Sequence, residues 1–266
     1  MEGAISVLSA LQLENAGILK IIVKQGANPR SAQKIISGAK AKNIEIVSFS
    51  PEEIIEFEKG VNGLGLRLLG GTHGGIFAVV KKRKFLSPRE LLDALPQNQK
   101  YLSIAIIEGI EDPYNLGYAA RAAYTQGVDA LILPERDFGF SEATIEKAST
   151  GTFSKLPVAV FSKDKTDKIA LIELLKGEGF RIYCIDKKAS AHSKAKISDI
   201  FETKFSERAA FVIGGEKRGI SGDFLQRADE IVKIPYAKAY AYSLAAQSAA
   251  TVISYEIHRQ RYANNK

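Results

Sequence analysis

The sequence has few of the residues that mark several common classes of protein. Cys184 is the one cysteine among 266 residues, which excludes an intrachain disulfide and predicts a reducing, cytoplasmic compartment. The three histidines lie far apart, and with a single cysteine they offer no metal-ligand spacing. No stretch approaches the roughly 18 consecutive apolar residues of a membrane span, and the first residues lack the basic segment of a secretion signal. We therefore expect neither a metal nor a membrane as partner.

The usual nucleotide and hydrolase signatures are missing as well. No expected strand is followed by G-x-G-x-x-G, and neither G-x-x-x-x-G-K-[ST] nor G-x-S-x-G occurs. These absences exclude a Rossmann dinucleotide site, a P-loop and the nucleophile elbow of a hydrolase.

Basic residues are in excess, by 37 Lys and Arg to 30 Asp and Glu, which gives a formal net charge of +7. The excess is densest in the first third of the chain, and residues 81–84, KKRK, are its peak. Positive charge favours a polyanionic partner such as RNA. A solvated linker explains the four basic residues equally well.

The pattern of apolar residues predicts helices alternating with strands, so the fold class is α/β. Residues 1–85 form a small α/β unit in which Ser50-Pro51-Glu52-Glu53 starts a helix, with serine as N-cap and acids in the first turn. A short helix after Ser87-Pro88 ends at Pro96, and a polar linker follows. We place the domain boundary there, giving domains 1–95 and 96–266.

The second domain is predicted to contain a parallel sheet with helices on either side. Its apolar strands alternate with helices, as in sheets buried on both faces. The strands are expected at 101–108, 128–133, 156–161, 180–186, 209–215 and 230–234. The last helix is expected to start with Ser243 as its cap.

Three loops follow strands at the carboxyl edge of this sheet, where parallel sheets bind ligands. The first, 108–121, holds a turn before a helix expected near Asn115, with Arg121 inside that helix and facing inward. The second, 214–221, begins with two glycines that allow a backbone to approach a ligand closely. The third, 235–243, precedes a helix of small residues suited to packing against a backbone, an adenine or a partner subunit. Each loop taken alone also has a purely structural explanation: the first an arginine on a helix surface, the second a glycine turn, and the third a well-packed core helix.

Together the three loops resemble the motifs of the SpoU/TrmH family of S-adenosylmethionine-dependent RNA ribose 2′-O-methyltransferases. The motifs are present as Asn115, Gly117 and Arg121; as Gly214, Glu216 and Gly219; and as Ile234-Pro235 with Ser243-Leu244. Residues 1–83 more loosely resemble the RNA substrate-binding domain joined to many of these enzymes, whose fold is shared with certain ribosomal RNA-binding proteins.

The resemblance implies a fold and a set of partners. The second domain would be a deep trefoil knot, the protein a homodimer, and its substrate structured RNA, ribosomal RNA more than transfer RNA. Backbone groups at four positions would hold the cofactor S-adenosylmethionine: Gly214, Gly219, Ile234 and Leu244.

The resemblance also implies the catalytic residues. Arg121 would be the catalytic arginine, with Asn115, Glu216 and Ser243 beside it. Because a guanidinium loses its proton only above a pH of about 12, we expect Arg121 to grip a phosphate and stabilise charge on the ribose oxygen rather than act as a base.

The third motif departs from the family pattern. Ala245 stands where the family has an asparagine, and the preceding loop is one residue longer. Gln247 or a tyrosine of the loop could compensate. The alternative function is a non-catalytic RNA-binding protein on a retained scaffold. An unrelated α/β enzyme for a small acidic metabolite explains neither the basic first domain nor the three ordered motifs.

Overall fold

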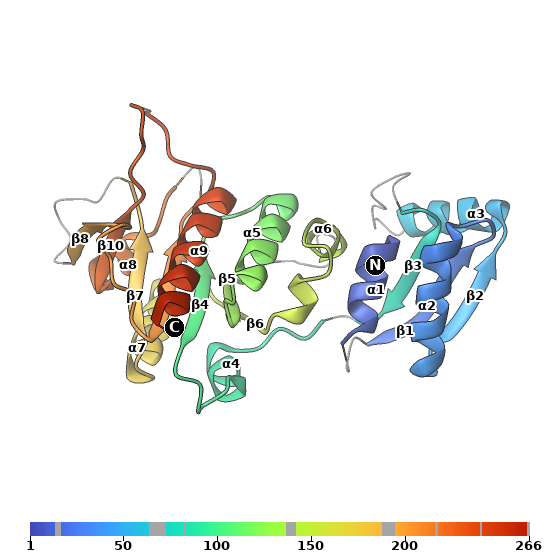
Figure 1. Cartoon of the computed structure of the whole chain (residues 1–266), viewed down its shortest axis with the longest axis horizontal. Coiled ribbons are helices and arrows are strands. Elements are labelled where there is room, and N and C mark those ends of the chain that lie inside the picture. Colours follow the sequence, from blue (N-terminus) through green and yellow to red (C-terminus); the bar gives the residue numbers. More distant parts are fainter. Residues whose placement is uncertain are drawn as a thin grey trace. The chain divides into compact units, whose positions relative to one another are not determined.

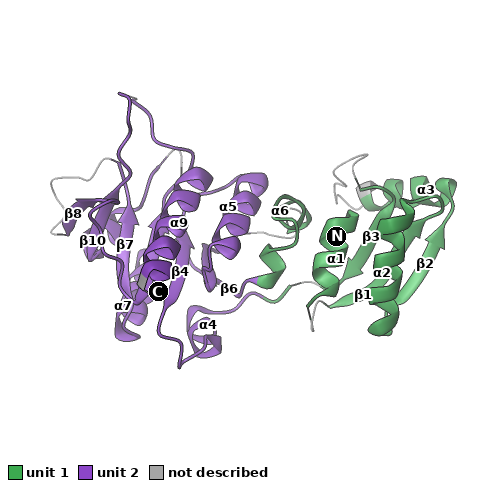
Figure 2. Cartoon of the chain, viewed as in Figure 1, with its two compact units in different colours: residues 1–84, 137–155 green, residues 85–136, 156–266 purple. Residues whose placement is uncertain are grey.

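A computed structural model describes residues 1–13, 17–63, 73–81, 83–136, 142–187, 195–215, 218–239 and 241–264. The chain packs into two compact units, coloured separately in Figure 2. The first unit joins residues 1–84 with 137–155, and the second joins 85–136 with 156–266. The predicted domains 1–95 and 96–266 stay a prediction.

The first unit contains a three-stranded sheet with helices on both faces. Its elements are α1 (Ala4–Leu11), β1 (Ile18–Lys24), α2 (Pro29–Ala41), β2 (Glu45–Phe49), α3 (Pro51–Gly63) and β3 (Ile76–Val80). The central strand β1 runs parallel to β2 and antiparallel to β3. Side chains of β1 alternate between the faces: Ile21 packs with α1 and α2, whereas Ile22 packs with Ile54 of α3.

The helix starts of this unit follow the capping signals in the sequence. The Ser50 hydroxyl accepts the Glu53 N–H at 3.2 Å, and the Glu53 carboxylate accepts the Ser50 N–H at 2.7 Å. This reciprocal pair is a capping box, so the predicted helix start is confirmed. Asn28 caps α2 in a related way, accepting the N–H groups of Arg30 and Ser31.

A segment distant in sequence completes the first unit. It contains α6 (Glu142–Ala148) and the 3₁₀ turn η1 (Phe153–Lys155). Lys147 pairs with the buried Glu2 carboxylate at 2.7 Å. Arg83 donates to the Phe153 carbonyl at 2.8 Å and stacks on the Phe153 ring. Arg83, one residue of the basic run 81–84, therefore packs against the protein, so the run is not a fully solvated linker.

The second unit is built on a seven-stranded sheet in which every described pairing is parallel (Figure 1). The order across the sheet is β6-β5-β4-β9-β7-β10-β8. The strands are β4 (Leu102–Ile107), β5 (Ala130–Pro134), β6 (Val158–Phe161), β7 (Arg181–Ile185), β8 (Lys196–Asp199), β9 (Arg208–Ile213) and β10 (Glu230–Lys233). The predicted α/β fold with a parallel sheet is confirmed, whereas the knot and the ribosomal-protein likeness of the first unit stay predictions.

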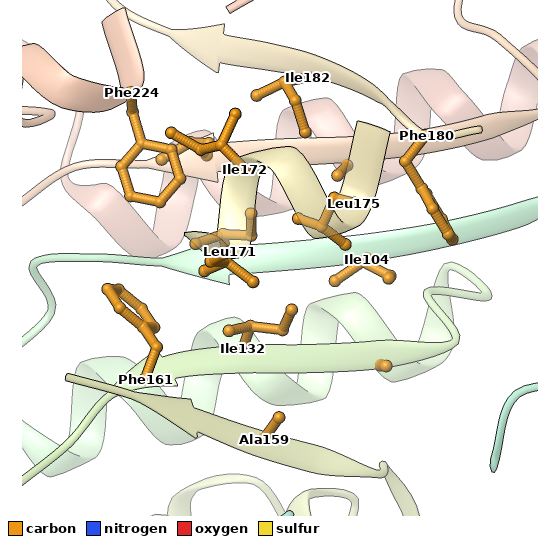
Figure 3. Close-up of a cluster of buried hydrophobic side chains, with 14 of the residues drawn as sticks. Ile104, Ile132, Ala159, Phe161, Leu171, Ile172, Leu175, Phe180, Ile182 and Phe224 are labelled. Atoms are coloured by element: carbon orange, nitrogen blue, oxygen red, sulfur yellow. The ribbon is translucent and has the colours of Figure 1, made fainter. Parts of the chain in front are cut away.

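Helices cover both faces of this sheet. They are α4 (Pro88–Ala94), α5 (Pro113–Thr125), α7 (Lys165–Gly177), α8 (Gly222–Arg227) and α9 (Ala246–Asn264). Figure 3 shows Leu171, Ile172 and Leu175 of α7 against side chains from the strands. Helices α5 and α9 pack side by side over the sheet (Figure 1). Every residue of β4 is buried, which explains why the central strands have continuous apolar runs.

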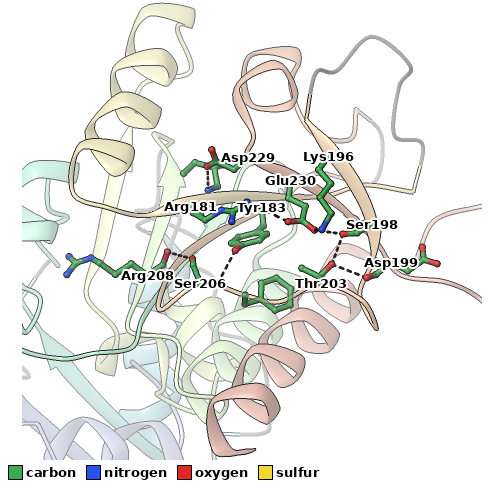
Figure 4. A network of polar contacts seen from close by, with 12 residues as sticks. Arg181, Tyr183, Lys196, Ser198, Asp199, Thr203, Ser206, Arg208, Asp229 and Glu230 are labelled. Carbon is green, nitrogen blue, oxygen red and sulfur yellow. Dashed lines mark hydrogen bonds and ion pairs between the residues drawn. The ribbon is translucent and has the colours of Figure 1, made fainter. Parts of the chain in front are cut away.

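The structure adds one strand that the sequence did not predict. Strand β8 is a polar edge strand with a single buried residue, Ser198. Figure 4 shows how buried polar groups hold it: the Glu230 carboxylate accepts the Ser198 hydroxyl at 2.5 Å and pairs with Lys196 at 3.0 Å. The strand therefore depends on tertiary partners rather than on an apolar pattern.

One predicted helix start differs by two residues, and one predicted helix cap is wrong. Helix α5 begins at Pro113, because the Asp112 carboxylate caps it by accepting the Asn115 N–H at 2.8 Å. Helix α9 begins at Ala246, so Ser243 lies in the preceding loop and is not its cap. The Ala245 carbonyl accepts the N–H groups of Ser248 and Ala249, which places the cap at Ala245.

None of the described helices is long and apolar enough to cross a membrane.

Candidate active site at the carboxyl edge of the sheet

A cavity of about 760 Å³ opens in the second unit at the carboxyl ends of β4, β5, β6 and β9. This is the edge at which open parallel sheets bind their ligands. The lining residues are Glu108, Gly109, Ile110, Glu111, Asp112, Asn115, Pro134, Phe161, Lys163, Lys168, Gly215, Arg218, Gly219, Ser221 and Ala246. The loops after β4 and β9 thus share one cavity with the first residue of α9.

Glycine is required where the loops after β4 and β9 touch. A Cβ on Gly109 would overlap the backbone nitrogen of Gly215, and one on Gly214 would overlap the backbone of Gly219. Gly215 and Gly219 also exchange two backbone hydrogen bonds, at 2.9 and 3.2 Å. Gly219 has a φ of 65°, in the left-handed region that favours glycine. These glycines therefore set the shape of the cavity wall through contact between backbones.

Glu108 ties three parts of the wall together. One carboxylate oxygen pairs with Lys168 of α7 at 3.0 Å, and the other accepts the Ser221 N–H, just before α8, at 2.8 Å. The Glu108 and Lys168 side chains are only 10% and 14% exposed. Glu108 was not predicted as a site residue, although an acid directly after a buried strand could have drawn attention to it.

Charges of both signs face the cavity. Lys163, Lys168 and Arg218 bring positive charge, whereas Glu108, Glu111 and Asp112 bring negative charge. Lys163 and Lys168 follow β6, a segment that none of the sequence motifs covers.

Arg136 holds the turn between β4 and α5. Its guanidinium donates to the carbonyls of Ile110 and Glu111, at 2.9 and 3.2 Å. Burial lowers the pKa of Arg136, and the nearby Glu111 carboxylate opposes that effect. Arg136 was also not predicted as a site residue. The sequence feature that could have indicated it is a cationic residue just after an apolar strand.

The structure brings three of the predicted site residues together. Asn115 is half-buried in the first turn of α5 and lines the cavity together with Gly219. Gly214 packs directly against Gly219. Glu216, predicted to be catalytic, lies outside the described residues.

Arg121 is placed differently from the prediction. It is exposed on α5, so the expectation that it faces inward is wrong. The buried side of α5 is formed instead by Leu116, Gly117, Ala119, Ala120 and Ala123. Arg121 is not among the residues that line the cavity of its own chain.

The remaining predicted residues belong to the loop between β10 and α9. Ile234 is half-buried, whereas Ser243 and Leu244 are exposed. The Leu244 N–H donates to the Tyr236 hydroxyl at 2.7 Å. None of these three predicted residues lines the cavity, although Ala246 at the end of the same segment does.

Other reactive groups are poor candidates for chemistry. Cys184 is buried in β7, and desolvation raises the pKa of its thiol. Within the part of the chain that the structure describes, no three histidine, cysteine or acidic side chains gather in a group that could hold a metal ion.

Known proteins resemble this chain in sequence and in fold. Residues 103–255, more than half of the chain, match the model of the SpoU rRNA methylase family. A protein of Staphylococcus epidermidis named as a TrmH family tRNA/rRNA methyltransferase is 30% identical over 246 residues, which are 92% of this chain and 89% of the relative.

Solved structures share the fold. The SpoU methyltransferase AviRb from Streptomyces viridochromogenes, in complex with the cofactor AdoMet, aligns with a TM-score of 0.74 at 21% identity over 99% of this chain and 90% of its own. An RNA 2′-O ribose methyltransferase aligns with a TM-score of 0.71 at 23% identity, over 98% and 88% of the two chains. With its motif residues at the carboxyl edge of a parallel sheet and this family model across most of the second unit, the chain belongs to the SpoU rRNA methylase family of RNA methyltransferases.

Proposed function

We propose that the protein transfers a methyl group from S-adenosylmethionine to a ribose 2′-hydroxyl in ribosomal RNA. The observation that carries the proposal is the meeting of Asn115 and Gly219, from two separate motifs, in one cavity at the ligand-binding edge of the sheet. The names of the similar structures, one bound to AdoMet and one a 2′-O ribose methyltransferase, support it. The non-catalytic alternative has no comparable support.

The site has the chemistry to hold the cofactor. S-adenosylmethionine carries a carboxylate, an ammonium, a sulfonium and ribose hydroxyls, and the cavity volume falls in the range of about 300–1,000 Å³ usual for such ligands. Lys163 and Arg218 suit the carboxylate, and Glu111 suits the cationic or hydroxyl groups. The proposed cofactor contacts are backbone groups at Gly219, which lines the cavity, and at Gly214, Ile234 and Leu244, which are not among its lining residues. When bound, the cofactor supplies an electrophilic methyl group.

The chain's own residues would then orient and activate the ribose. A 2′-hydroxyl is a weak nucleophile: its oxygen would bond to the methyl carbon as the methyl–sulfur bond breaks, S-adenosylhomocysteine would leave, and the hydroxyl proton would pass to solvent water. The guanidinium of Arg121 would grip the adjacent phosphate and stabilise charge developing on the oxygen. Asn115, Glu216 and Ser243 are the further proposed catalytic residues, and holding the hydroxyl in line would supply much of the remaining acceleration.

A homodimer would complete the site. Arg121 does not line the cavity of its own chain, so we assign it to the cavity of a partner. The helices α5 and α9, which pack together, both expose large apolar side chains: Tyr114, Tyr118, Val252, Tyr255 and Tyr262. An exposed apolar surface of this kind is typical of a protein interface.

The part of the first unit that falls in the proposed domain 1–95 would bind the RNA. Helix α2 exposes Arg30, Lys34 and Lys40 and contains no acid. Such a helix suits phosphates, which supply much of the affinity for nucleic acids. An added substrate domain favours ribosomal over transfer RNA, and the cytoplasm is where that RNA is found.

The test is Arg121→Ala in the full-length protein. Ribose 2′-O-methylation is mapped across total RNA from three strains: with the gene, without it, and with the variant in its place. We expect the ribosomal RNA methylation that the gene confers to be lost in the strain with the variant. Calorimetry should show that S-adenosylmethionine still binds. Arg89→Ala is the matched control, because Arg89 is an exposed arginine on α4 that pairs with Glu178 and does not line the cavity. Unchanged methylation in Arg121→Ala, or no cofactor binding by the wild type, would overturn the proposal.

A further inference from the structure

The loop between β10 and α9 carries several of the proposed site residues yet is little buried. Its described residues are 234–239 and 241–245, and Figure 1 shows them as the orange-red segment that extends beyond the sheet before α9. Residues 241–244 are exposed. A loop with so little burial has few apolar contacts that could fix its conformation. Its conformation therefore depends on specific polar contacts.

Tyr236 closes this loop at its base. Its hydroxyl accepts the N–H of Leu244 at 2.7 Å, a short hydrogen bond across eight positions of the chain. Tyr236 follows Ile234-Pro235, and Leu244 comes two residues before α9. One side chain therefore joins the start of the loop to its end, and a phenylalanine could not make this bond because it lacks the hydroxyl.

Lys187 holds the same loop from the neighbouring strand. It lies just after β7, which pairs with β10 in the sheet. Its ammonium sits 4.6 Å from the centre of the Tyr236 ring and donates to the Tyr242 carbonyl at 2.9 Å. A cation over an aromatic face is attracted to it. Lys187 therefore fixes the Tyr236 ring and, through Tyr242, the far side of the loop.

We propose that Tyr236 and Lys187 are positioning residues that hold the loop 234–245 in the conformation that receives the methyl donor. This inference rests on the proposed function, which places donor contacts at Ile234 and Leu244. A loop already ordered before binding does not lose conformational freedom when the ligand arrives, so the ligand binds more tightly. Since the Leu244 N–H is occupied by Tyr236, the donor contact at this residue falls to another backbone group, its carbonyl.

Two single variants of the full-length protein test the proposal by calorimetry with S-adenosylmethionine. Tyr236→Phe keeps the ring beneath Lys187 and removes the hydroxyl; Lys187→Met keeps the stem and removes the charge. We expect each to weaken S-adenosylmethionine binding about tenfold, without lowering the thermal midpoint of the protein alone. In the double variant the fold-loss of S-adenosylmethionine affinity should be smaller than the product of the two single losses, because both residues act on one loop.

Amide hydrogen exchange supplies a direct readout of the loop. In Tyr236→Phe the Leu244 amide should exchange faster than in the wild type, while amides of β4 stay unchanged. Tyr101→Phe is the matched control for deleting a hydroxyl, because Tyr101 lies at the opposite, amino end of β4. It should bind S-adenosylmethionine like the wild type.

The outcomes separate this inference from the proposed function. If the wild type binds S-adenosylmethionine and Tyr236→Phe binds it equally well, the positioning role is refuted while the proposed function stands. If the wild type does not bind it, the proposed function fails and the inference fails with it. Weaker binding with a matching loss of thermal stability would indicate a general structural role and would also overturn the inference.

Discussion

The pair between Glu108 and Lys168 gives the sharpest stability prediction for the cavity wall. With side chains 10% and 14% exposed, the pair is in the buried regime, in which removing one partner costs about 3–5 kcal/mol. Lys168→Met leaves the Glu108 carboxylate without its cation but keeps the Ser221 hydrogen bond. We therefore expect a loss of about 3 kcal/mol in the free energy of unfolding, the lower end of that range.

A second variant shows whether the loss comes from an unpaired charge. Glu108→Gln together with Lys168→Met removes both charges and keeps an oxygen for the Ser221 N–H. Replacing a buried pair as a whole is often close to neutral, so the double variant should recover most of the stability that Lys168→Met loses.

Urea-induced unfolding, compared at equal slope, measures these differences. The control lies on the same helix: Lys176 pairs with Asp229 at 3.2 Å, with side chains 33% and 29% exposed. Lys176→Met should cost at most about 1 kcal/mol, as expected for pairs open to solvent. If Lys168→Met lowers the free energy of unfolding no more than Lys176→Met does, the Glu108–Lys168 pair behaves as a solvated pair and the reasoning is wrong.

Two further predictions concern a buried acid and a helix cap. Desolvation raises the pKa of Glu146 in α6 from 4.5 to about 6, although the Ser154 hydroxyl donates to it. Between these pH values the unfolded chain has lost a proton that the folded chain keeps, so stability falls as pH rises. The fall amounts to about 2 kcal/mol, and Glu146→Gln should remove this component in unfolding curves measured from pH 4.5 to 7. A wild type and variant with parallel pH profiles would contradict this. Ala245→Asn should raise the thermal midpoint through about 1 kcal/mol of added stability, because Ala245 caps α9 without a side-chain acceptor. An unchanged or lower midpoint would show that the introduced asparagine does not cap the helix.

The sequence predicted the elements whose signals are local. Strands such as β4 are buried along their whole length and appear as continuous apolar runs, and the start of α3 follows from a serine, a proline and two acids. The loops after β4 and β9, which the sequence analysis placed at one edge of the sheet, line one cavity there, because carboxyl ends of parallel strands meet at the same edge.

The missed features depend on tertiary partners. Strand β8 alternates little and is held by the buried Glu230 carboxylate, which no local pattern reveals. The cap of α9 is Ala245 rather than the predicted Ser243, against the intrinsic preference for serine, and the residue before the cap, Leu244, is held by the Tyr236 hydroxyl. The wall residues Glu108 and Arg136 were overlooked for a similar reason: their roles come from contacts with distant segments.

The geometry of α5 explains why the expectation that Arg121 faces inward was wrong, and it agrees with the proposed homodimer. Asn115 and Arg121 are six residues apart, so the helix turns by about 600° between them. Arg121 therefore lies about 120° around the axis from Asn115 and about 9 Å further along it. A helix whose first turn lines the cavity must then direct Arg121 elsewhere, in agreement with its exposure. In the proposed homodimer one helix would serve two cavities, its own through Asn115 and the partner's through Arg121.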